Sequence, residues 1–557
     1  MRRRARSLRF GAALCTVALG VPACSPASTA PTRPTGPITV RTGVTTHFSQ
    51  GWPPRLIASA KELGTATIRD SVHWAQVEQS PGTYTFTPRN SGHVSAACEA
   101  GMSVLLGIEP RNRIYDGGTT AYSPAAQTAF ARYVAAIAAR WPDCVVAIEI
   151  GNEINGQNNV SGPAARDRIA AHVALLRTVY QAVKPAHPGL LLIGGSTNTI
   201  ATGFLARLFK AGMLDWVDAV AVHPYRPEPE GVDWELSRLQ AAMAEAGTVK
   251  PIWATEFSRE FPDPATAGPF YLKMIALLES SGVGDHFWYA LIDQRFFPTM
   301  GLLTQAGARK PAAAAYAFAA STLAPRGPAQ RIDEHDPALF HFRFGSDAHL
   351  VWGAPRPLTV SGQAKAFAAD GTALAAIPAA VSDQPVVITG ASALAFGPPE
   401  VLADSLYGFA QPPLTWFAQR ADAPPLLLVP IDWQWASYLG TPAMPQISVN
   451  TAGIGTTPAA GTLVRYTATD DGPVLASVCL RPKAASMRAL AVLRRNGSEL
   501  TRALTGGPGG ATQLAARSTV KSGDIVELRL TPLPGAPLSR FAYRFRVARG
   551  GSGVIGC

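Results

Sequence analysis

Short apolar segments alternate with longer amphipathic segments over residues 39–325. The short segments have the length of buried strands, and the longer ones, rich in Ala, Leu and Arg, have the length of helices. The predicted strands are Gly43–Phe48, Thr65–Arg69, Ser103–Glu109, Val145–Glu149, Leu190–Gly194, Ala219–His223, Pro251–Glu256 and His286–Ala290. The predicted helices include Ala125–Arg140, Pro163–Val183, Phe204–Ala211, Trp234–Ala246, Pro269–Ser281 and Pro311–Leu323. Strands that alternate with helices in this way predict an α/β fold, a closed parallel (β/α)8 TIM barrel.

An open, doubly wound sheet is the alternative interpretation of the same pattern. Such a sheet should carry a glycine-rich phosphate-binding turn after its first strand. The segment Gly43-Val44-Thr45-Thr46-His47 is not such a turn. The pattern therefore favours the barrel.

The helical periodicity stops after residue 325, where short strands separated by Gly, Pro and Asp follow. We expect a small β-domain packed on the barrel at 326–397 and a C-terminal β-sandwich at 398–557. Trp433, Trp435 and Tyr438 form either a sugar-stacking platform, which would make the sandwich carbohydrate-binding, or part of its core. The alternation of Trp433 and Trp435 onto one face favours the core.

The first residues have the pattern of a secretory signal. A basic region, Arg2–Arg9, precedes an apolar stretch, Phe10–Ala23, which is too short to span a bilayer. Val21-Pro22-Ala23-Cys24 is similar to a bacterial lipobox, in which Cys24 would be lipidated; cleavage by an ordinary signal peptidase is the alternative. We therefore expect a signal peptide at 1–23, a Pro/Thr-rich tether at 24–38, and an exported protein. It would reside in the cell envelope, as a periplasmic or outer-membrane lipoprotein, or outside the cell, and would meet the membrane only through a lipid anchor.

Four cysteines lie beyond this segment, and in an oxidising compartment they allow three pairings. We expect the disulfides Cys98–Cys144 and Cys479–Cys557, because each pair lies within one predicted domain; buried free thiols are the alternative. No Cys or His spacing suggests a metal site. The net charge is +11, but arginines of the signal segment contribute five positive charges, and no basic stripe follows. We therefore expect no nucleic-acid partner.

Polar residues occur where the predicted strands end. In a TIM barrel these positions surround the mouth at which ligands bind, and packing alone does not call for such residues there. They include His47, Arg69, Glu109, Asn152, Glu153, Asn198, His223, Tyr225, Glu256 and Trp288.

Two of these positions carry the carboxylates that glycosidic bond cleavage requires. Glu153 follows the fourth strand in Gly151-Asn152-Glu153, and Glu256 ends the seventh strand in Ala254-Thr255-Glu256-Phe257. Across an eight-stranded mouth these two ends can face each other. Hydrolysis with retention needs two carboxyl groups about 5–5.5 Å apart, one as proton donor and one as nucleophile.

The pattern resembles that of the clan A glycoside hydrolases, with Asn-Glu after strand four, Glu after strand seven and Arg after strand two. Ile68-Arg69-Asp70, Trp74, Val77-Glu78 and the segment from Pro81 to Phe86 are similar to glycoside hydrolase family 39, and in particular to its exopolysaccharide-cleaving endoglycosidases from biofilm operons. The resemblance covers residues 40–325.

This resemblance implies that Glu153 is the acid/base and Glu256 the nucleophile. Asn152 would bind the sugar 2-hydroxyl, and Arg69 would hold Glu256 ionised. His223 and Tyr225 would orient Glu256 or contact the sugar, and Trp288 would provide a flat platform for a sugar ring.

Three neighbouring polar residues have two interpretations each. Glu149 precedes Glu153 by four residues and could face the barrel interior as a structural acid. Glu109 binds sugar hydroxyls or forms an ion pair with Arg111 or Arg113. His47 contacts the substrate or is a buried core histidine.

Taken together, the sequence predicts a monomeric retaining glycoside hydrolase that cleaves inside a polysaccharide, with a bacterial exopolysaccharide as substrate. The mechanism requires no metal or organic cofactor. A transglycosylase on the same substrate and a non-catalytic polysaccharide-binding protein of an export system are the alternatives.

Overall fold

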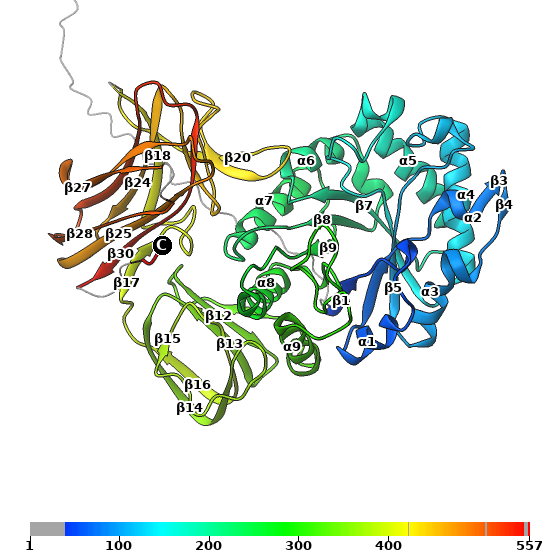
Figure 1. The fold of residues 1–557 in the computed structure, drawn as a ribbon, viewed down its shortest axis with the longest axis horizontal. Coiled ribbons are helices and arrows are strands. Elements are labelled where there is room, and N and C mark those ends of the chain that lie inside the picture. Colours follow the sequence, from blue (N-terminus) through cyan, green and yellow to red (C-terminus); the bar gives the residue numbers. More distant parts are fainter. Residues whose placement is uncertain (1–38, 422, 507–509, 551–554) are drawn as a thin grey trace, which may run out of the picture.

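The computed structural model describes residues 39–421, 423–506, 510–550 and 555–557 (Figure 1). The predicted signal peptide, Cys24 and the predicted tether lie outside the described residues. Among the described helices, none is long and apolar enough to cross a membrane.

The first part of the chain is the predicted closed parallel barrel, with strand order β1-β10-β9-β8-β7-β6-β5-β2. Its strands are β1 (Arg41–Thr45), β2 (Thr67–Asp70), β5 (Ser103–Ile108), β6 (Val145–Ile150), β7 (Leu191–Asn198), β8 (Ala219–His223), β9 (Ile252–Phe257) and β10 (Asp285–Trp288). Each lies within a few residues of its predicted position. A small hairpin, β3 (Glu78–Ser80) and β4 (Thr83–Tyr84), follows β2 and the short helix α2 (Trp74–Val77).

Helices cover the outside of the barrel (Figure 1). They are α1 (Leu56–Glu62), α3 (Pro88–Glu99), α4 (Pro124–Arg140), α5 (Arg168–Val183), α6 (Thr202–Lys210), α7 (Val232–Glu245), α8 (Ala267–Ser280) and α9 (Pro311–Phe318). Strand side chains that point outward pack against these helices, whereas inward-pointing ones fill the barrel with a separate cluster that includes Leu105, Ile193, Trp253 and Phe287. Gly43 is required beside this cluster, because a Cβ there would lie 2.4 Å from the Phe287 ring.

A six-stranded antiparallel sheet follows the barrel and lies against α8 and α9 (Figure 1). Its strands are β11 (Gln330–Ile332), β12 (Leu339–Phe344), β13 (Ala348–Gly353), β14 (Arg356–Phe367), β15 (Ala380–Val381) and β16 (Val386–Phe396). Buried Glu230 ties it to the barrel, because its Oε1 accepts hydrogen bonds of 3.0 Å from Trp352 Nε1 and from Lys273 Nζ.

The remaining strands form the expected C-terminal sandwich around one apolar core. One sheet contains β17 (Val401–Asp404), β23 (Ile454–Thr456), β25 (Gly472–Pro482), β28 (Thr512–Val520) and β30 (Ser539–Arg549). The other contains β18 (Leu414–Arg420), β19 (Leu426–Leu427), β24 (Ala460–Thr467), β26 (Ala489–Arg495), β27 (Ser498–Thr505) and β29 (Ile525–Pro532). A smaller sheet of β20 (Val429–Asp432), β21 (Ser437–Gly440) and β22 (Ser448–Val449) extends from the sandwich toward α6 and α7 (Figure 1).

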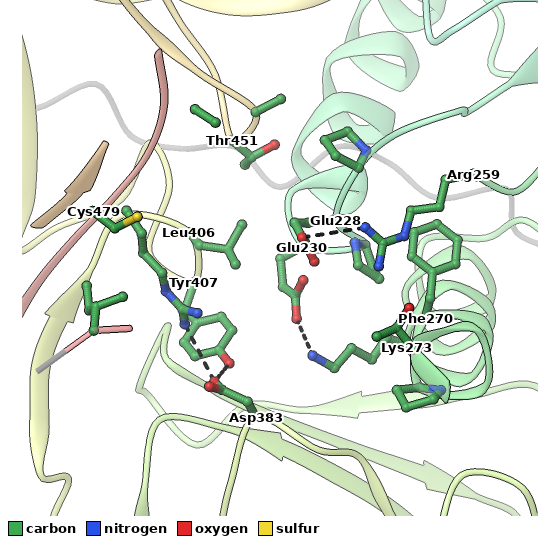
Figure 2. A pocket seen from close by; sticks show the side chains of 18 of the residues that line it. Glu228, Glu230, Arg259, Phe270, Lys273, Asp383, Leu406, Tyr407, Thr451 and Cys479 are labelled. Atoms are coloured by element: carbon green, nitrogen blue, oxygen red, sulfur yellow. Dashed lines mark hydrogen bonds and ion pairs between the residues drawn. The ribbon is translucent and has the colours of Figure 1, made fainter. Parts of the chain in front are cut away.

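The barrel, the six-stranded sheet of β11–β16 and the sandwich meet around a cavity of about 640 Å³ (Figure 2). Several of its charged side chains form ion pairs. Lys273 pairs with Glu230 at 3.0 Å, Arg544 with Asp383 at 3.5 Å, and Arg259 lies 3.9 Å from Glu228. The Arg544–Asp383 pair joins the sandwich to the six-stranded sheet, whereas the other two pairs lie within the barrel.

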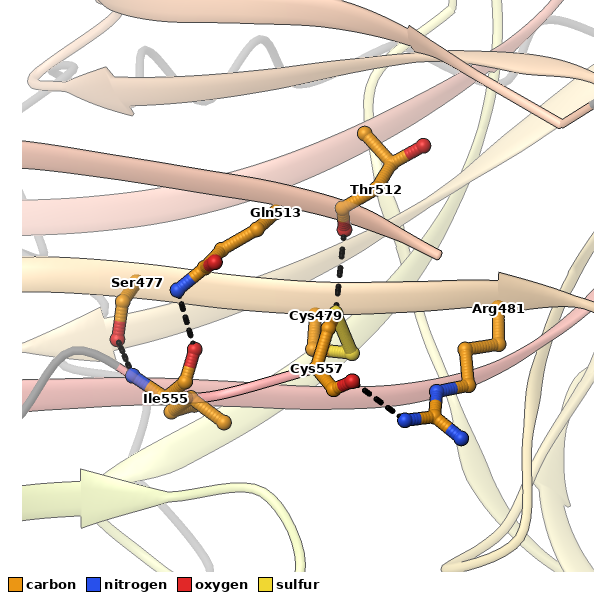
Figure 3. The surroundings of a disulfide bond; sticks show 7 residues. All are labelled: Ser477, Cys479, Arg481, Thr512, Gln513, Ile555 and Cys557. Atoms are coloured by element: carbon orange, nitrogen blue, oxygen red, sulfur yellow. Dashed lines mark hydrogen bonds between the residues drawn. A yellow bond between two sulfur atoms is a disulfide. The ribbon is translucent and has the colours of Figure 1, made fainter. Parts of the chain in front are cut away.

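Both expected disulfides are present. Cys98 of α3 is bonded to Cys144, which immediately precedes β6, with 5.6 Å between the Cα atoms. Cys479 of β25 is bonded to Cys557, and the carbonyl oxygen of Cys557 accepts a 2.5 Å hydrogen bond from Arg481 (Figure 3). Each bond lies within one part of the fold, as the sequence predicted.

Candidate active site

Glu256, near the end of β9, is held at both carboxylate oxygens. Oε1 accepts a 2.5 Å hydrogen bond from Arg69 Nη1, and Oε2 accepts one of 2.6 Å from the Tyr225 hydroxyl. Burial alone would raise the pKa of this carboxyl, but the positive charges of His223 and Arg69 and the Tyr225 hydrogen bond lower it below its ordinary value. Glu256 is therefore an ionised and oriented carboxylate.

Arg69, on β2, organises the floor of the barrel mouth. Besides Glu256 it contacts Glu149, through a 2.8 Å hydrogen bond from Nε, and Asn152, through one of 2.9 Å from Nη2. A buried guanidinium with three fixed partners cannot rotate without breaking several charge-assisted bonds. The side chains of Glu256, Glu149 and Asn152 are therefore fixed in position relative to one another.

Glu149 is the interior acid that one interpretation of the sequence anticipated. It is fully buried, and its second oxygen accepts a 3.0 Å hydrogen bond from Thr255 Oγ1. Burial opposes its ionisation, but the charges of Arg69 and His223 and hydrogen bonds outweigh it, and they lower the pKa of Glu149 to about 2. Its negative charge offsets the buried positive charge of Arg69.

Glu153 lies on a tight turn after β6. Gly151 has φ +86° and Glu153 itself has φ +45°, a left-handed conformation that is uncommon for residues with a side chain. Oε1 of Glu153 accepts a 2.7 Å hydrogen bond from Asn198 Nδ2 and lies 3.2 Å from His223 Nδ1. The side chain is 23% exposed, and its Oε2 has no hydrogen-bond partner among the described residues. The carboxyl group of Glu153 is therefore partly accessible to solvent and has one unengaged oxygen.

The two carboxylates converge on His223. One oxygen of Glu153, one oxygen of Glu256 and a ring nitrogen of His223 all lie within 4.8 Å of one another. This separation fits the pair used for retention, and it is shorter than the roughly 6.5–9.5 Å that inversion needs to accommodate a water molecule. The arrangement therefore places two carboxyl groups with different surroundings close enough to act on a single bond.

The same three residues are a group of described side chains that could bind a metal ion. The chemistry of the donor set argues against this use. Both Glu256 oxygens already accept hydrogen bonds, and the Arg69 guanidinium would lie beside the ion. Burial disfavours a charged His223, but the carboxylates of Glu256, Glu149 and Glu153 raise its pKa to about 9. A protonated imidazole cannot ligate a metal.

The remaining predicted residues are placed as follows. Asn152 accepts through Oδ1 a hydrogen bond from Arg69, and its side-chain amide hydrogens have no acceptor among the described residues. His47 packs edge-on against Trp52 and Tyr289, and its Nε2 is buried without a partner among the described residues. Glu109 is half-exposed with Arg111 Nε at 3.9 Å, which favours the ion-pair interpretation.

The expectation that Trp288 forms a sugar platform is wrong. The side chain is fully buried, stacks on Phe261 and donates a 2.9 Å hydrogen bond from Nε1 to the carbonyl oxygen of Met300. Tyr289, one residue later, faces the mouth instead, where its ring lies 6.1 Å from that of Tyr225. Neighbouring strand residues point to opposite faces, so an error of one residue exchanges a core side chain for a site side chain.

Asn198 was missed as a partner of Glu153, although it ends β7 at one of the polar strand exits. Its carbonyl oxygen accepts a 3.0 Å hydrogen bond from Asn155 Nδ2, while Asn155 Oδ1 accepts one of 2.9 Å from the Asn198 amide. These bonds fix the β7 exit against the loop that carries Glu153. The position at a strand exit was the available signal in the sequence.

Comparisons with known proteins agree with this fold. The chain matches no family model and no curated protein sequence. It is similar to the structure of a family 39 glycoside hydrolase from the gut symbiont Bacteroides cellulosilyticus WH2, with a TM-score of 0.54, 18% identity, and coverage of 63% of this chain and 81% of that one. A family 39 β-xylosidase from Caulobacter crescentus aligns with a TM-score of 0.48, 16% identity, and coverage of 65% and 98%. At 18% identity, the first similarity shows a shared fold.

The charge on His223 should make stability depend on pH. Because its pKa in the folded protein, about 9, exceeds the ordinary 6.5, its stabilising contribution is complete below pH 6.5 and is lost as the pH rises through 9. We expect the free energy of unfolding of the wild type to fall over this window by an amount on the order of a few kcal/mol. In His223→Gln, the free energy of unfolding should not show this decrease between pH 6.5 and 9.

Denaturant unfolding at pH 6, 7.5 and 9 measures this effect. His335→Gln removes an exposed histidine whose side chain is 90% accessible, and it should leave the wild-type dependence intact. Parallel curves for the wild type and His223→Gln would show that His223 does not carry the charge.

Proposed function

We propose that the protein is a retaining glycoside hydrolase that cleaves bonds inside a polysaccharide. The observation that carries this proposal is the Glu153–Glu256 pair, whose oxygens lie within 4.8 Å while Arg69 and Tyr225 hold Glu256. The fold shared with a family 39 glycoside hydrolase supports it. So does the resemblance of the sequence motifs to that family.

The chemistry follows from the two environments. Ionised Glu256 attacks the anomeric carbon, while Glu153 donates its proton to the leaving oxygen, so that a glycosyl-enzyme ester forms as the glycosidic bond breaks. Glu153 then removes a proton from water, the water oxygen attacks the same carbon, and Glu256 is released. The free amide hydrogens of Asn152 are available to bind the sugar 2-hydroxyl, a contact that strengthens in the transition state.

We also propose that the substrate is a bacterial exopolysaccharide met outside the cytoplasm. The two disulfides fit an oxidising compartment, and the signal-like first residues fit export. The partial exposure of Glu153 at the barrel mouth suits a chain that passes across the site. The motif resemblance to exopolysaccharide endoglycosidases supports the same substrate class.

Glu256→Gln should abolish depolymerisation, because an amide cannot form the glycosyl-enzyme. We expect a fall in turnover of about 10⁴-fold or more, with the fold and polysaccharide binding retained. The assay is the size distribution of products from a panel of purified bacterial exopolysaccharides; a mixture of shortened chains is expected from the wild type. Glu260→Gln, at an exposed carboxyl group, is the matched control and should leave activity unchanged. Activity of Glu256→Gln near that of the wild type would refute the nucleophile assignment.

Glu153→Gln should slow substrates according to their leaving groups. Poor leaving groups need the proton and should suffer most, whereas an activated aryl glycoside should retain its first step. Added azide should then partly restore turnover by attacking the glycosyl-enzyme without base assistance, and should yield a glycosyl azide of retained configuration. Equal losses on both kinds of substrate, with no effect of azide, would contradict the acid/base role.

A further inference from the structure

The hairpin formed by β20 and β21 reaches from the sandwich to the barrel beside the acid/base. Its turn, residues 433–436, carries Trp433 and Trp435, and Trp433 is 50% exposed. These tryptophans are therefore not core residues of the sandwich, contrary to the interpretation that their alternation favoured. Two tryptophans on an exposed turn call for an explanation other than packing.

Backbone contacts hold this hairpin against the barrel. The carbonyl oxygen of Trp433 accepts a 3.1 Å hydrogen bond from the Gly203 amide, and the carbonyl oxygen of Trp435 accepts one from Thr199 Oγ1. Asp432 pairs with Arg238 through both of its oxygens, at 3.2 and 2.7 Å. Gly203 permits the approach, since a Cβ there would lie 2.5 Å from the Asp432 carbonyl oxygen. The docking is therefore close and specific.

Two consecutive residues, Asn198 and Thr199, connect Glu153 to the hairpin. Thr199, which bonds to the Trp435 carbonyl oxygen, directly follows Asn198, and Asn198 donates to Glu153 Oε1. Asn155 bonds to the Asn198 backbone and reaches the Gln434 carbonyl oxygen at 3.5 Å. The turn of the hairpin thus borders the loop that presents the proton donor.

A groove of about 530 Å³ lies between this turn and that loop. Its wall includes Asn155, Gln157, Arg166, Arg207, Gln434 and Trp435. The side chains of Arg166 and Arg207 make no hydrogen bond or ion pair with the described residues, so their donors are free for sugar oxygens. An aromatic ring together with unengaged polar donors is the usual composition of a site that orients a small polar ligand.

We propose that this groove binds the sugar units on the leaving-group side of the scissile bond, with Trp435 and Arg207 as binding residues. The inference rests on the proposed function and extends it. In the proposed mechanism Glu153 protonates the leaving oxygen, so the departing part of the chain extends from the Glu153 side of the site. The wall of the groove includes Asn155, two residues after Glu153. The sandwich thereby contributes to substrate recognition through one hairpin, whether or not its other surfaces bind sugar.

The test compares two substrates in variants of the groove. Trp435→Ala should lower kcat/KM for the polysaccharide on the order of tenfold, mainly through KM, since loss of about 1.4 kcal/mol of binding is tenfold. The same variant should leave kcat/KM for an aryl glycoside of a single sugar within twofold of the wild type, because that leaving group ends before the groove. Arg207→Gln, on the exposed face of α6, should also lower kcat/KM for the polysaccharide and leave kcat/KM for the aryl glycoside nearly unchanged.

Trp433→Ala is the matched control, since this side chain belongs to the same turn but does not line the groove. It should leave both substrates within twofold of the wild type. Unchanged polysaccharide kinetics in Trp435→Ala and Arg207→Gln, or equal losses on both substrates, would overturn the subsite. A wild-type enzyme inactive on every glycoside would instead refute the proposed function, so the two failures are distinguishable.

Discussion

The buried guanidinium of Arg69 is the interaction on which the site depends. It binds Glu149, Glu256 and Asn152 from one strand end, and so joins β2, β6 and β9 across the barrel mouth. A buried positive charge requires buried negative partners, and Glu149 supplies one that takes no part in the proposed chemistry. With that charge balanced, Glu256 can be buried, ionised and correctly oriented at the same time.

The second requirement is that the two carboxylates differ. Glu256 accepts hydrogen bonds at both oxygens and is nearly buried, whereas Glu153 is bonded at one oxygen and faces the opening of the mouth. His223 lies against both, and its positive charge lets two carboxylates approach closely. In the proposed mechanism these different surroundings assign different tasks to chemically identical groups.

The sequence predicted most of this arrangement because strand periodicity locates strand ends, and in a parallel barrel strand ends locate the site. It placed Arg69, Asn152, Glu153, His223, Tyr225 and Glu256 at one mouth. It failed at Trp288, where the exact strand end decides whether residue 288 or 289 faces inward. A pattern that fixes a strand only to within a residue or two cannot fix which face a side chain takes.

Contacts between distant parts of the chain could not be predicted from the sequence, for a different reason. Asn155 and Gln434 are separated by 279 positions, and no local pattern links them. Alternation placed Trp433 and Trp435 on one face but could not show that the hairpin turn borders the loop that carries Glu153. The role that we propose for the sandwich therefore rests on the three-dimensional arrangement alone.

The central claim is that Glu153 and Glu256 act on one bond by two successive displacements. The anomeric configuration of the first-formed product, followed by NMR before mutarotation on a polysaccharide that the enzyme depolymerises, tests it most directly. The account predicts that the new reducing end has the configuration of the bond that was cleaved. A product that first appears with the opposite configuration would contradict it, because a single displacement by water would then have occurred.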